Sequence, residues 1–334
     1  MPVAGQPSLG ETAPLPSRGM IGAMTRPIRR LRQASRTERR EWLFAFILLL
    51  PSLTMLGAFV AYPFLRGIWL SLTDAVVGRE GAFVGIDNFI KLWNDSIFRR
   101  AAQNTFVYTA AATVLKLTLG MLVALMLNNL MGFKRFLRAS MLLPWIVPTV
   151  LSTLAWKWMF DPTFSIVNWL LFRLGFIHLR IDWLGGPVVA MWSVILVNVW
   201  RGTPFFAITL LAGLQTISPD VHEAAAIDGA SPWQRFWRVT WPLLLPVTMV
   251  VVLFAVIQTF ADFQLVYILT GGGPANSTHL FATYAYQLGV ATAKLGEGAA
   301  ASIAMFPMLF LVVLFQLWYI RRGDSGAGRA RWRK

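Results

Sequence analysis

Polar residues on two apolar segments are the candidates for chemistry in this chain. Two groups follow helical spacing, so each shares one helix face: Asn198, Arg201, Gly202 and Phe205 in one segment, and Gln258, Thr259 and Asp262 in the other. Planar polar side chains bridge neighbouring hydroxyl groups, and aromatic rings stack on the apolar face of a sugar. The two faces predict a binding site for a small polar solute. The alternative is hydrogen bonding between helices, with Arg201 and Asp262 as an internal ion pair.

Catalytic signatures are missing from the sequence. It has no phosphate-binding Walker loop, no HExxH or GxSxG motif and no paired carboxylates in an aqueous domain. It has no cysteine and three histidines, so we predict no metal site, no thiol nucleophile and no catalytic residue. We expect a protein that is not an enzyme.

The composition is typical of a protein embedded in lipid. Of 334 residues, 56% are hydrophobic and only 13% are charged, which is too much apolar surface for one water-soluble core. The net charge of +15 does not indicate nucleic-acid binding, because the basic residues flank apolar segments instead of clustering in a soluble domain.

Six segments are long and apolar enough to cross a bilayer, which takes about 20 helical residues. We predict them at Trp42 to Phe64, Thr105 to Asn129, Ala139 to Phe160, Pro187 to Leu214, Trp241 to Ile268 and Gly298 to Ile320. Each must be helical, because lipid offers no hydrogen-bond partner to the backbone. The first is too long and too far from the N-terminus for a cleaved signal peptide. The predicted fold class is therefore an all-α integral membrane protein with six transmembrane helices over residues 42–320.

The basic residues predict the orientation of these helices. Nineteen Lys and Arg residues lie on the side of the termini and eight lie on the opposite side. This bias predicts that both termini are cytoplasmic. The basic tails, residues 1–41 and 321–334, contain few apolar residues and are predicted to be unfolded.

Two lysines fall within predicted membrane helices. Lys157 lies near the outer end of its segment between Trp156 and Trp158, and we interpret it as an interfacial anchor. Lys116 lies nearer the middle of the second segment. Either it faces a pore or the boundary of the segment is misplaced, and the sequence does not decide between the two.

The loop at residues 218–242 is predicted to be cytoplasmic and to form two short helices around a turn. Ser218 is a candidate N-cap with Pro219 at the first helical position, and Gly229 can end the first helix in a left-handed conformation. Small residues flanked by carboxylates give this helix a surface that another protein can approach closely: Glu223, Ala224, Ala225, Ala226 and Asp228. The surface is suited to docking in a groove. An ordinary amphipathic connector at the lipid interface is the alternative.

The loop also resembles a known motif. Glu223-Ala224-Ala225, Gly229 and the ending Val239-Thr-Trp-Pro242 have the spacing of the EAA loop of bacterial ABC importer permeases. The resemblance extends over the membrane region and is strongest to the sugar branch, which includes the maltose and glycerol-phosphate permeases. The segments that carry it are Asn104-Thr105, Phe133-Lys-Arg-Phe136 and Leu269-Thr-Gly-Gly-Gly-Pro-Ala-Asn-Ser-Thr278.

This resemblance implies the type I ABC importer permease fold and a set of partners. These are a separate ABC ATPase dimer that binds ATP and Mg and receives the coupling helix, a periplasmic solute-binding protein, and a second permease subunit, usually a related but different chain. The resemblance implies import of a sugar, oligosaccharide or polyol across the bacterial inner membrane. Coupling would involve Glu223, Ala224, Ala225, Asp228 and Gly229. Six of the seven candidate residues, all except Arg201, fall where the maltose permease contacts its sugar, although identity holds notably at Asn198 and Gly202.

Three other functions fit parts of the sequence. An ABC permease for amino acids, phosphate, peptides or glycerol 3-phosphate is nearest, but the long outer segment 65–104 and the turn at Gly271 to Pro274 favour sugars. An ion-coupled transporter would use Arg201 and Asp262, but it requires inverted repeats, and we find no convincing internal repeat. A membrane enzyme would need clustered His or carboxylate residues, and the outer aspartates are scattered.

Overall fold

The computed structural model describes residues 36–129 and 134–330. Within these ranges the chain is helical apart from loops and two isolated β-bridges, which confirms the prediction of an all-α fold. The described residues divide into two compact units between Leu65 and Arg66. The helices, including the π-helical turns η2, η3 and η4, are α2 (Arg36–Leu56), η2 (Gly57–Ala61), α3 (Tyr62–Ser71), α4 (Asp87–Asn94), α5 (Ser96–Asn129), α6 (Lys134–Ile146), α7 (Thr149–Met159), α8 (Ile166–Arg173), α9 (Pro187–Gln215), α10 (Pro219–Ile227), α11 (Pro232–Arg235), η3 (Phe236–Thr240), α12 (Trp241–Phe260), α13 (Gln264–Leu269), α14 (Phe281–Tyr286), η4 (Gln287–Ala291) and α15 (Leu295–Ala330).

Five continuous helical segments are long and apolar enough to cross a membrane. They are Leu43–Ser71, Ser96–Asn129, Pro187–Leu214, Pro232–Phe260 and Leu295–Trp318. The first segment, α2 to α3, presents exposed apolar side chains such as Phe59, as expected of a helix surrounded by lipid.

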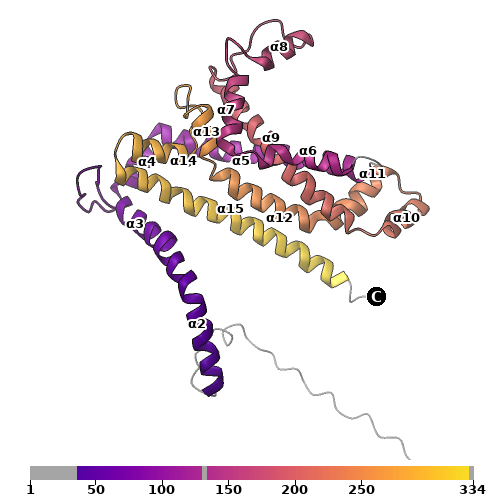
Figure 1. Ribbon diagram of the computed structural model, residues 1–334, viewed down its shortest axis with the longest axis horizontal. Coiled ribbons are helices and arrows are strands. Elements are labelled where there is room, and N and C mark those ends of the chain that lie inside the picture. The colour runs from indigo at the N-terminus through magenta and orange to yellow at the C-terminus, as the bar shows by residue number, and fades with distance from the viewer. Residues whose placement is uncertain (1–35, 130–133, 331–334) are drawn as a thin grey trace, which may run out of the picture. The chain divides into compact units, whose positions relative to one another are not determined.

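The other four spans belong to the second unit and form its core. The helices α5, α9, α12 and α15 run alongside one another in Figure 1, with α5 packed along α9, α12 against both, and α15 against α12. One buried cluster fills the space between α5, α9 and α12, a second joins α5 and α9 to α13, and a third joins α4, α5, α14 and α15. This bundle holds the candidate site.

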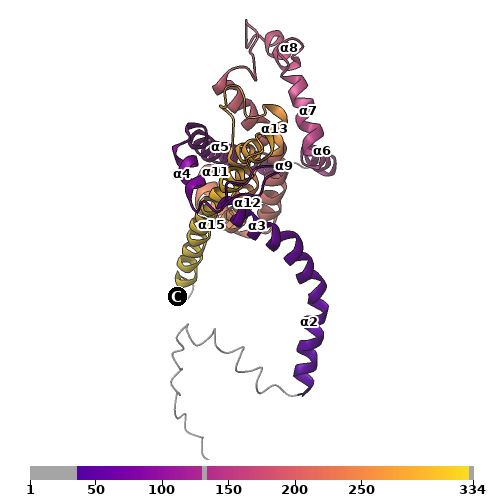
Figure 2. The same cartoon turned by 90° about the vertical axis from the view of Figure 1, so that its left-hand side faces the viewer.

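The third predicted span, Ala139 to Phe160, is helical but broken, and it is the sixth span when its two parts are taken together. It consists of α6 and α7, which are bent by 90° at a short break. The break lies at Val147 and Pro148, because proline has no backbone N–H to donate and it pushes the preceding residue out of helical geometry. The arm α6 packs against α9, while α7 packs against α13 and, with α8, extends away from the bundle (Figures 1 and 2).

The fifth predicted span, Trp241 to Ile268, is also interrupted. The helix α12 ends at Phe260, and Asp262 lies in the break before α13. The Oδ1 atom of Asp262 accepts a hydrogen bond from the backbone N–H of Leu265 at 3.4 Å. An aspartate that satisfies a free N–H at the start of a helix favours a new start over continuation.

The helices at both ends of the described chain extend further than predicted. The helix α2 begins at Arg36 and α15 continues through Ala330, so parts of both segments predicted to be unfolded are helical. Residues 1–35 and 331–334, together with Phe133 of the short basic loop, lie outside the described residues.

Gly120 sets the closest approach of α5 to α9. A Cβ atom at this position would lie 2.4 Å from the Cβ atom of Phe206 and 3.2 Å from the backbone N atom of Ala207. Small residues that let backbones approach are a main source of helix association in lipid, where burial of apolar surface contributes little.

We predict that Gly120→Ala lowers the free energy of unfolding by about 1–3 kcal/mol, because overpacking forces α5 away from α9. Thermal unfolding of the purified protein in detergent measures this loss. Gly67→Ala is the matched control, since no atom lies within 4 Å of the added Cβ. Equal thermal stability of the two variants would show that the contact at Gly120 is not a constraint.

Candidate functional site

A buried network of polar side chains joins α5, α9 and α12. The ammonium group of Lys116 donates to Asn198 Oδ1 at 2.9 Å and to Thr259 Oγ1 at 2.7 Å. Asn198 Nδ2 donates to Asp262 Oδ2 at 3.0 Å, and the Tyr108 hydroxyl donates to the same oxygen at 2.8 Å. All five side chains are buried. Asn198 therefore bridges a lysine and an aspartate that do not touch each other.

The position of Lys116 resolves the question left open by the sequence. It lies within the continuous span Ser96–Asn129, with 4% of its surface exposed, and its side chain points into the bundle. Gly202 makes room for it, because a Cβ atom there would lie 2.4 Å from Lys116 Cδ. The sequence did not place Lys116 or Tyr108 in the site. Their separation of eight residues puts both on one face of α5. This spacing could have indicated from the sequence that the two residues belong together.

Arg201 does not pair with Asp262. Its Nη1 atom donates to the hydroxyl of Thr149 at the start of α7, whereas Asp262 accepts from Asn198 and Tyr108. Within the described ranges, the ion pairs are Arg79 with Asp74 and Lys294 with Glu297, both outside the spans' interior network. Of the alternative left open by the sequence, the ion pair is therefore absent from the described residues, because Arg201 bonds to Thr149 of the broken span, but the hydrogen bonding between helices is present.

A small cavity of about 50 Å³ lies between α5, α6, α9 and α12. Six of the seven predicted residues line it: Asn198, Arg201, Gly202, Phe205, Gln258 and Thr259. Asp262 does not line the cavity and lies behind Asn198 in the network. The cavity is too small to enclose a sugar, and these residues form its wall.

An aromatic surface forms part of this wall. Phe205 stacks on Trp145 of α6 with ring centroids 4.9 Å apart, and it lies 5.1 Å from the ring of Phe254. Trp145 and Phe254 were not among the residues predicted from the sequence. Phe254 precedes Gln258 by one helical turn and was detectable by spacing. Trp145 reaches the site only because of the packing of α6 against α9.

A larger cavity of about 670 Å³ lies in the segment 162–180 around α8. Asn168, one of several polar residues that line it, is engaged in holding the segment together, since it donates to the carbonyl of Ile181 and accepts from Trp183 Nε1. We assign the site to the smaller cavity, because its polar groups line the space between the spans.

The predicted coupling loop forms the two helices α10 and α11. Ser218 caps α10 by accepting from the backbone N–H of Asp220, and Gly229 ends it with a φ of 80°. The backbone N–H of Ala230 bonds to the carbonyl of Ala225, as in a left-handed C-cap. Four of the five predicted coupling residues are exposed, namely Glu223, Ala224, Asp228 and Gly229, and Ala225 is half-buried.

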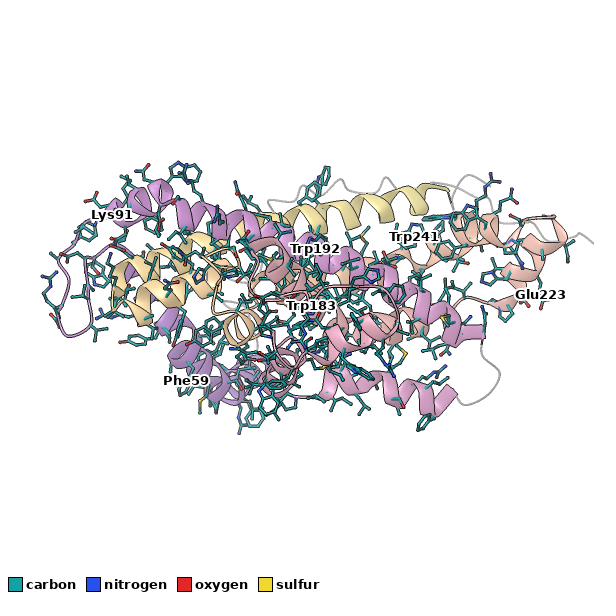
Figure 3. All side chains as sticks on the ribbon, turned by 90° about the horizontal axis from the view of Figure 1, so that it is seen from above. Phe59, Lys91, Trp183, Trp192, Glu223 and Trp241 are labelled. Atoms are coloured by element: carbon teal, nitrogen blue, oxygen red, sulfur yellow. The ribbon has the colours of Figure 1, made fainter. Side chains whose placement is uncertain are left out.

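The tip of α10 carries a large apolar side chain. Ile227 is 87% exposed, next to the predicted coupling surface. Figure 3 shows Glu223 of α10 and Lys91 of α4 at opposite ends of the second unit. The loop that contains α10 connects α9 to α12 by way of α11 and η3. The helices α9 and α12 carry the predicted cavity residues.

The glycine-rich segment after α13 is a compact turn at the other end of the bundle. Thr278 holds it closed, with its hydroxyl 2.6 Å from the carbonyl oxygen of Gly273 and 2.7 Å from the Thr270 hydroxyl. Asn104 of α5 donates to the carbonyls of Ser277 and His279 at 2.8 and 3.1 Å. Two of the sequence segments that carry the resemblance therefore contact each other.

His279 is buried beneath this turn. A Cβ atom at Gly272, whose φ is 92°, would lie 2.1 Å from the imidazole ring. Burial lowers the pKa of His279 below its ordinary value of 6.5, while a hydrogen bond with Gln287 opposes this shift.

The chain forms a bundle of membrane helices with a polar, aromatic-lined cavity between them. An exposed, capped helix lies at one end of the bundle. This is the architecture of a membrane transport subunit. Comparison with known proteins specifies the family. The model of the binding-protein-dependent transport system inner membrane component matches residues 116–323, and the chain belongs to this family. It is thus a multi-pass ABC importer permease and not an enzyme.

Individual relatives align over a longer part of the chain than the family model does. The chain is 36% identical to the trehalose/maltose transport system permease protein MalF of Thermococcus litoralis, over 86% of this chain and 96% of that protein. It is 34% identical to the sulfoquinovosyl glycerol transport system permease protein SmoG of Agrobacterium fabrum, over 84% and 92%. Among solved structures, a chain of a bacterial ABC transporter involved in import of the acidic polysaccharide alginate superposes with a TM-score of 0.74 at 25% identity, over 85% of this chain and 96% of that one.

We predict that Asn198→Leu lowers the free energy of unfolding by about 3 kcal/mol, because it leaves Lys116 and Asp262 without the side chain that bridges them. Thermal unfolding in detergent provides the measurement. Thr203→Val is the matched control, since its hydroxyl bonds only to the carbonyl of Val199 in its own helix. A loss no larger than that of the control would contradict a bridging role for Asn198.

The buried imidazole of His279 predicts acid sensitivity. Because its pKa is lower in the folded than in the unfolded protein, the unfolded state binds more protons as the pH falls through about 6.5, and stability decreases. We expect the midpoint of thermal unfolding to fall between pH 7.5 and 5.5, and His279→Gln to flatten this dependence. An unchanged slope in the variant would exclude His279 as the titrating group.

Proposed function

We propose that this chain is the permease subunit of a binding-protein-dependent ABC importer for a sugar, oligosaccharide or polyol. The observation that carries the proposal is connectivity: the exposed helix α10 lies in the chain between α9 and α12, whose facing side chains line the polar cavity. A force applied to α10 is therefore transmitted to both sides of the cavity, through one short connection to α9 and through a second to α11, η3 and α12.

The carbohydrate class is supported by the relatives and by the cavity wall. The similar permeases named above serve trehalose/maltose and sulfoquinovosyl glycerol, and a further relative in Streptomyces coelicolor serves diacetylchitobiose uptake. Asn198, Gln258 and Thr259 offer amide and hydroxyl groups to sugar hydroxyls, and the stacked pair Trp145 and Phe205 offers aromatic faces.

The partners follow from what this chain lacks by itself. The cavity of about 50 Å³ is too small to hold a sugar by itself. We propose that its residues form one wall of a larger binding site and that a second, related permease subunit supplies the other wall. An ATPase dimer that binds ATP and Mg receives α10, with Glu223, Ala224, Ala225, Asp228 and Gly229 at the contact and Ile227 in an apolar groove. A periplasmic solute-binding protein delivers the substrate. The basic tails and α10 lie in the cytoplasm, as the bias of Lys and Arg indicates.

The proposed cycle uses the same connections. Nucleotide closes the ATPase dimer, which moves α10 inward and rocks α9 and α12 so that the cavity opens to the outside. Substrate passes from the binding protein to the cavity, and hydrolysis returns the helices to their first positions. Asp262 acts from behind Asn198 by holding its amide in one orientation. The alternative that stays closest is an ABC permease for another solute, such as glycerol 3-phosphate or an amino acid.

The test is a charge reversal at the proposed contact. We expect Glu223→Lys to reduce co-purification of the ATPase subunit and ATP-dependent uptake into proteoliposomes about tenfold, equivalent to about 1.4 kcal/mol of binding free energy. Glu80→Lys makes the same charge change at another exposed carboxylate outside α10 and is the control. Unchanged association and uptake in the Glu223 variant would contradict the coupling role of α10.

A further inference from the structure

The charged residues that line the cavity are both basic. Lys116 and Arg201 contribute to its wall, and no aspartate or glutamate does. The nearest carboxylate in the network, Asp262, lies behind Asn198 and accepts two hydrogen bonds there, from Asn198 Nδ2 and the Tyr108 hydroxyl. The wall that faces a solute is therefore cationic.

The two charged groups of the network and the neighbouring Arg201 do not balance. Lys116 and Asp262 compensate each other through the Asn198 amide, which accepts from one and donates to the other. Arg201 bonds to the neutral hydroxyl of Thr149, and neither it nor Lys116 has a carboxylate within ion-pair distance in the described ranges. A guanidinium group stays protonated in proteins, so one positive charge is uncompensated.

An uncompensated charge inside a membrane span is costly and is retained where it meets a partner or a ligand. Arginine matches an oxyanion with two parallel N–H donors, and such charge-assisted bonds are about twice as strong as neutral ones. The neighbouring aromatic surface of Trp145, Phe205 and Phe254 is apolar and carries no further cation. The wall thus combines a surface for a sugar ring with a point of attachment for one anionic group.

We propose that the transported solute is an acidic sugar, whose carboxylate or comparable oxyanion is held by Arg201 with Lys116 as the second cation. This inference rests on the proposed function and narrows it to a substrate class. Lys116 is then a specificity-determining residue: Asn198 and Thr259 orient its ammonium group, and one of its three N–H bonds stays available for the oxyanion. A neutral sugar would leave the positive charge of Arg201 without a compensating anion.

The first experiment identifies the ligand class with the binding protein that serves this transporter. Its thermal stabilisation is measured against matched pairs of neutral oligosaccharides and their uronic acid counterparts, with sulfonated and phosphorylated sugars, polyols and amino acids included. We expect stabilisation by acidic sugars and not by their neutral counterparts. Stabilisation by neutral sugars alone would overturn this inference and leave the proposed function intact. Stabilisation by no carbohydrate or polyol would overturn both.

The second experiment tests the residues in the assembled transporter. In proteoliposomes that contain the full complex and binding protein, we expect Arg201→Gln and Lys116→Gln to reduce uptake of the stabilising acidic sugar about tenfold or more, as loss of a charge-assisted hydrogen bond predicts. Arg201→Lys keeps the positive charge but loses the two parallel donors, so it should restore only part of the uptake. Lys157→Gln is the matched control, because this lysine of α7 bonds to the carbonyl of Ile268 and does not line the cavity.

Folding is checked by the thermal unfolding midpoint and by the basal ATPase rate of each complex. Unchanged uptake in Arg201→Gln would overturn the inference. The inference would also be overturned if the Arg201→Gln variant dissociated from the complex during purification. That outcome would indicate that the guanidinium group pairs with a carboxylate of the second permease subunit.

Discussion

The hydrogen bonds of Lys116, Asn198 and Asp262 constrain this bundle more than any single apolar contact. Lipid is as apolar as a leucine side chain, so burial of apolar surface contributes little to helix association, and polar groups have no water to return to. One amide in α9 satisfies a lysine from α5 and an aspartate beyond the end of α12. The rotation of all three helices is set by these bonds.

The same network explains the departures from simple spanning helices. Asp262 both accepts from Asn198 and caps α13, so the end of α12 coincides with the polar network. At the other side of the cavity, the break at Pro148 begins α7 with Thr149, which accepts from Arg201. Each interruption of a span therefore places a polar group beside the site. Irregular backbone at this depth is tolerated where it is buried in protein or lines a cavity.

The two ends of the bundle have different mechanical roles in the proposed cycle. At one end, α10 is exposed, capped by Ser218 and closed by Gly229, so it is a rigid element on two short connections. At the other end, Asn104 ties α5 to the glycine-rich turn through two backbone carbonyls. A movement of α10 would be transmitted along α9 and α12, while the turn that follows α13 stays tied to α5 by these bonds.

The sequence by itself determined the membrane class, the approximate position of the spans, the caps of α10 and the two polar helix faces. These features depend on local composition and on spacing along one helix, and both can be read without knowing neighbours. Only the tertiary structure decided that Lys116 joins the site, that Trp145 lines it and that Arg201 bonds to Thr149 instead of Asp262. Spacing defines which residues share a face, but the rotation of each helix against its neighbours decides what that face meets.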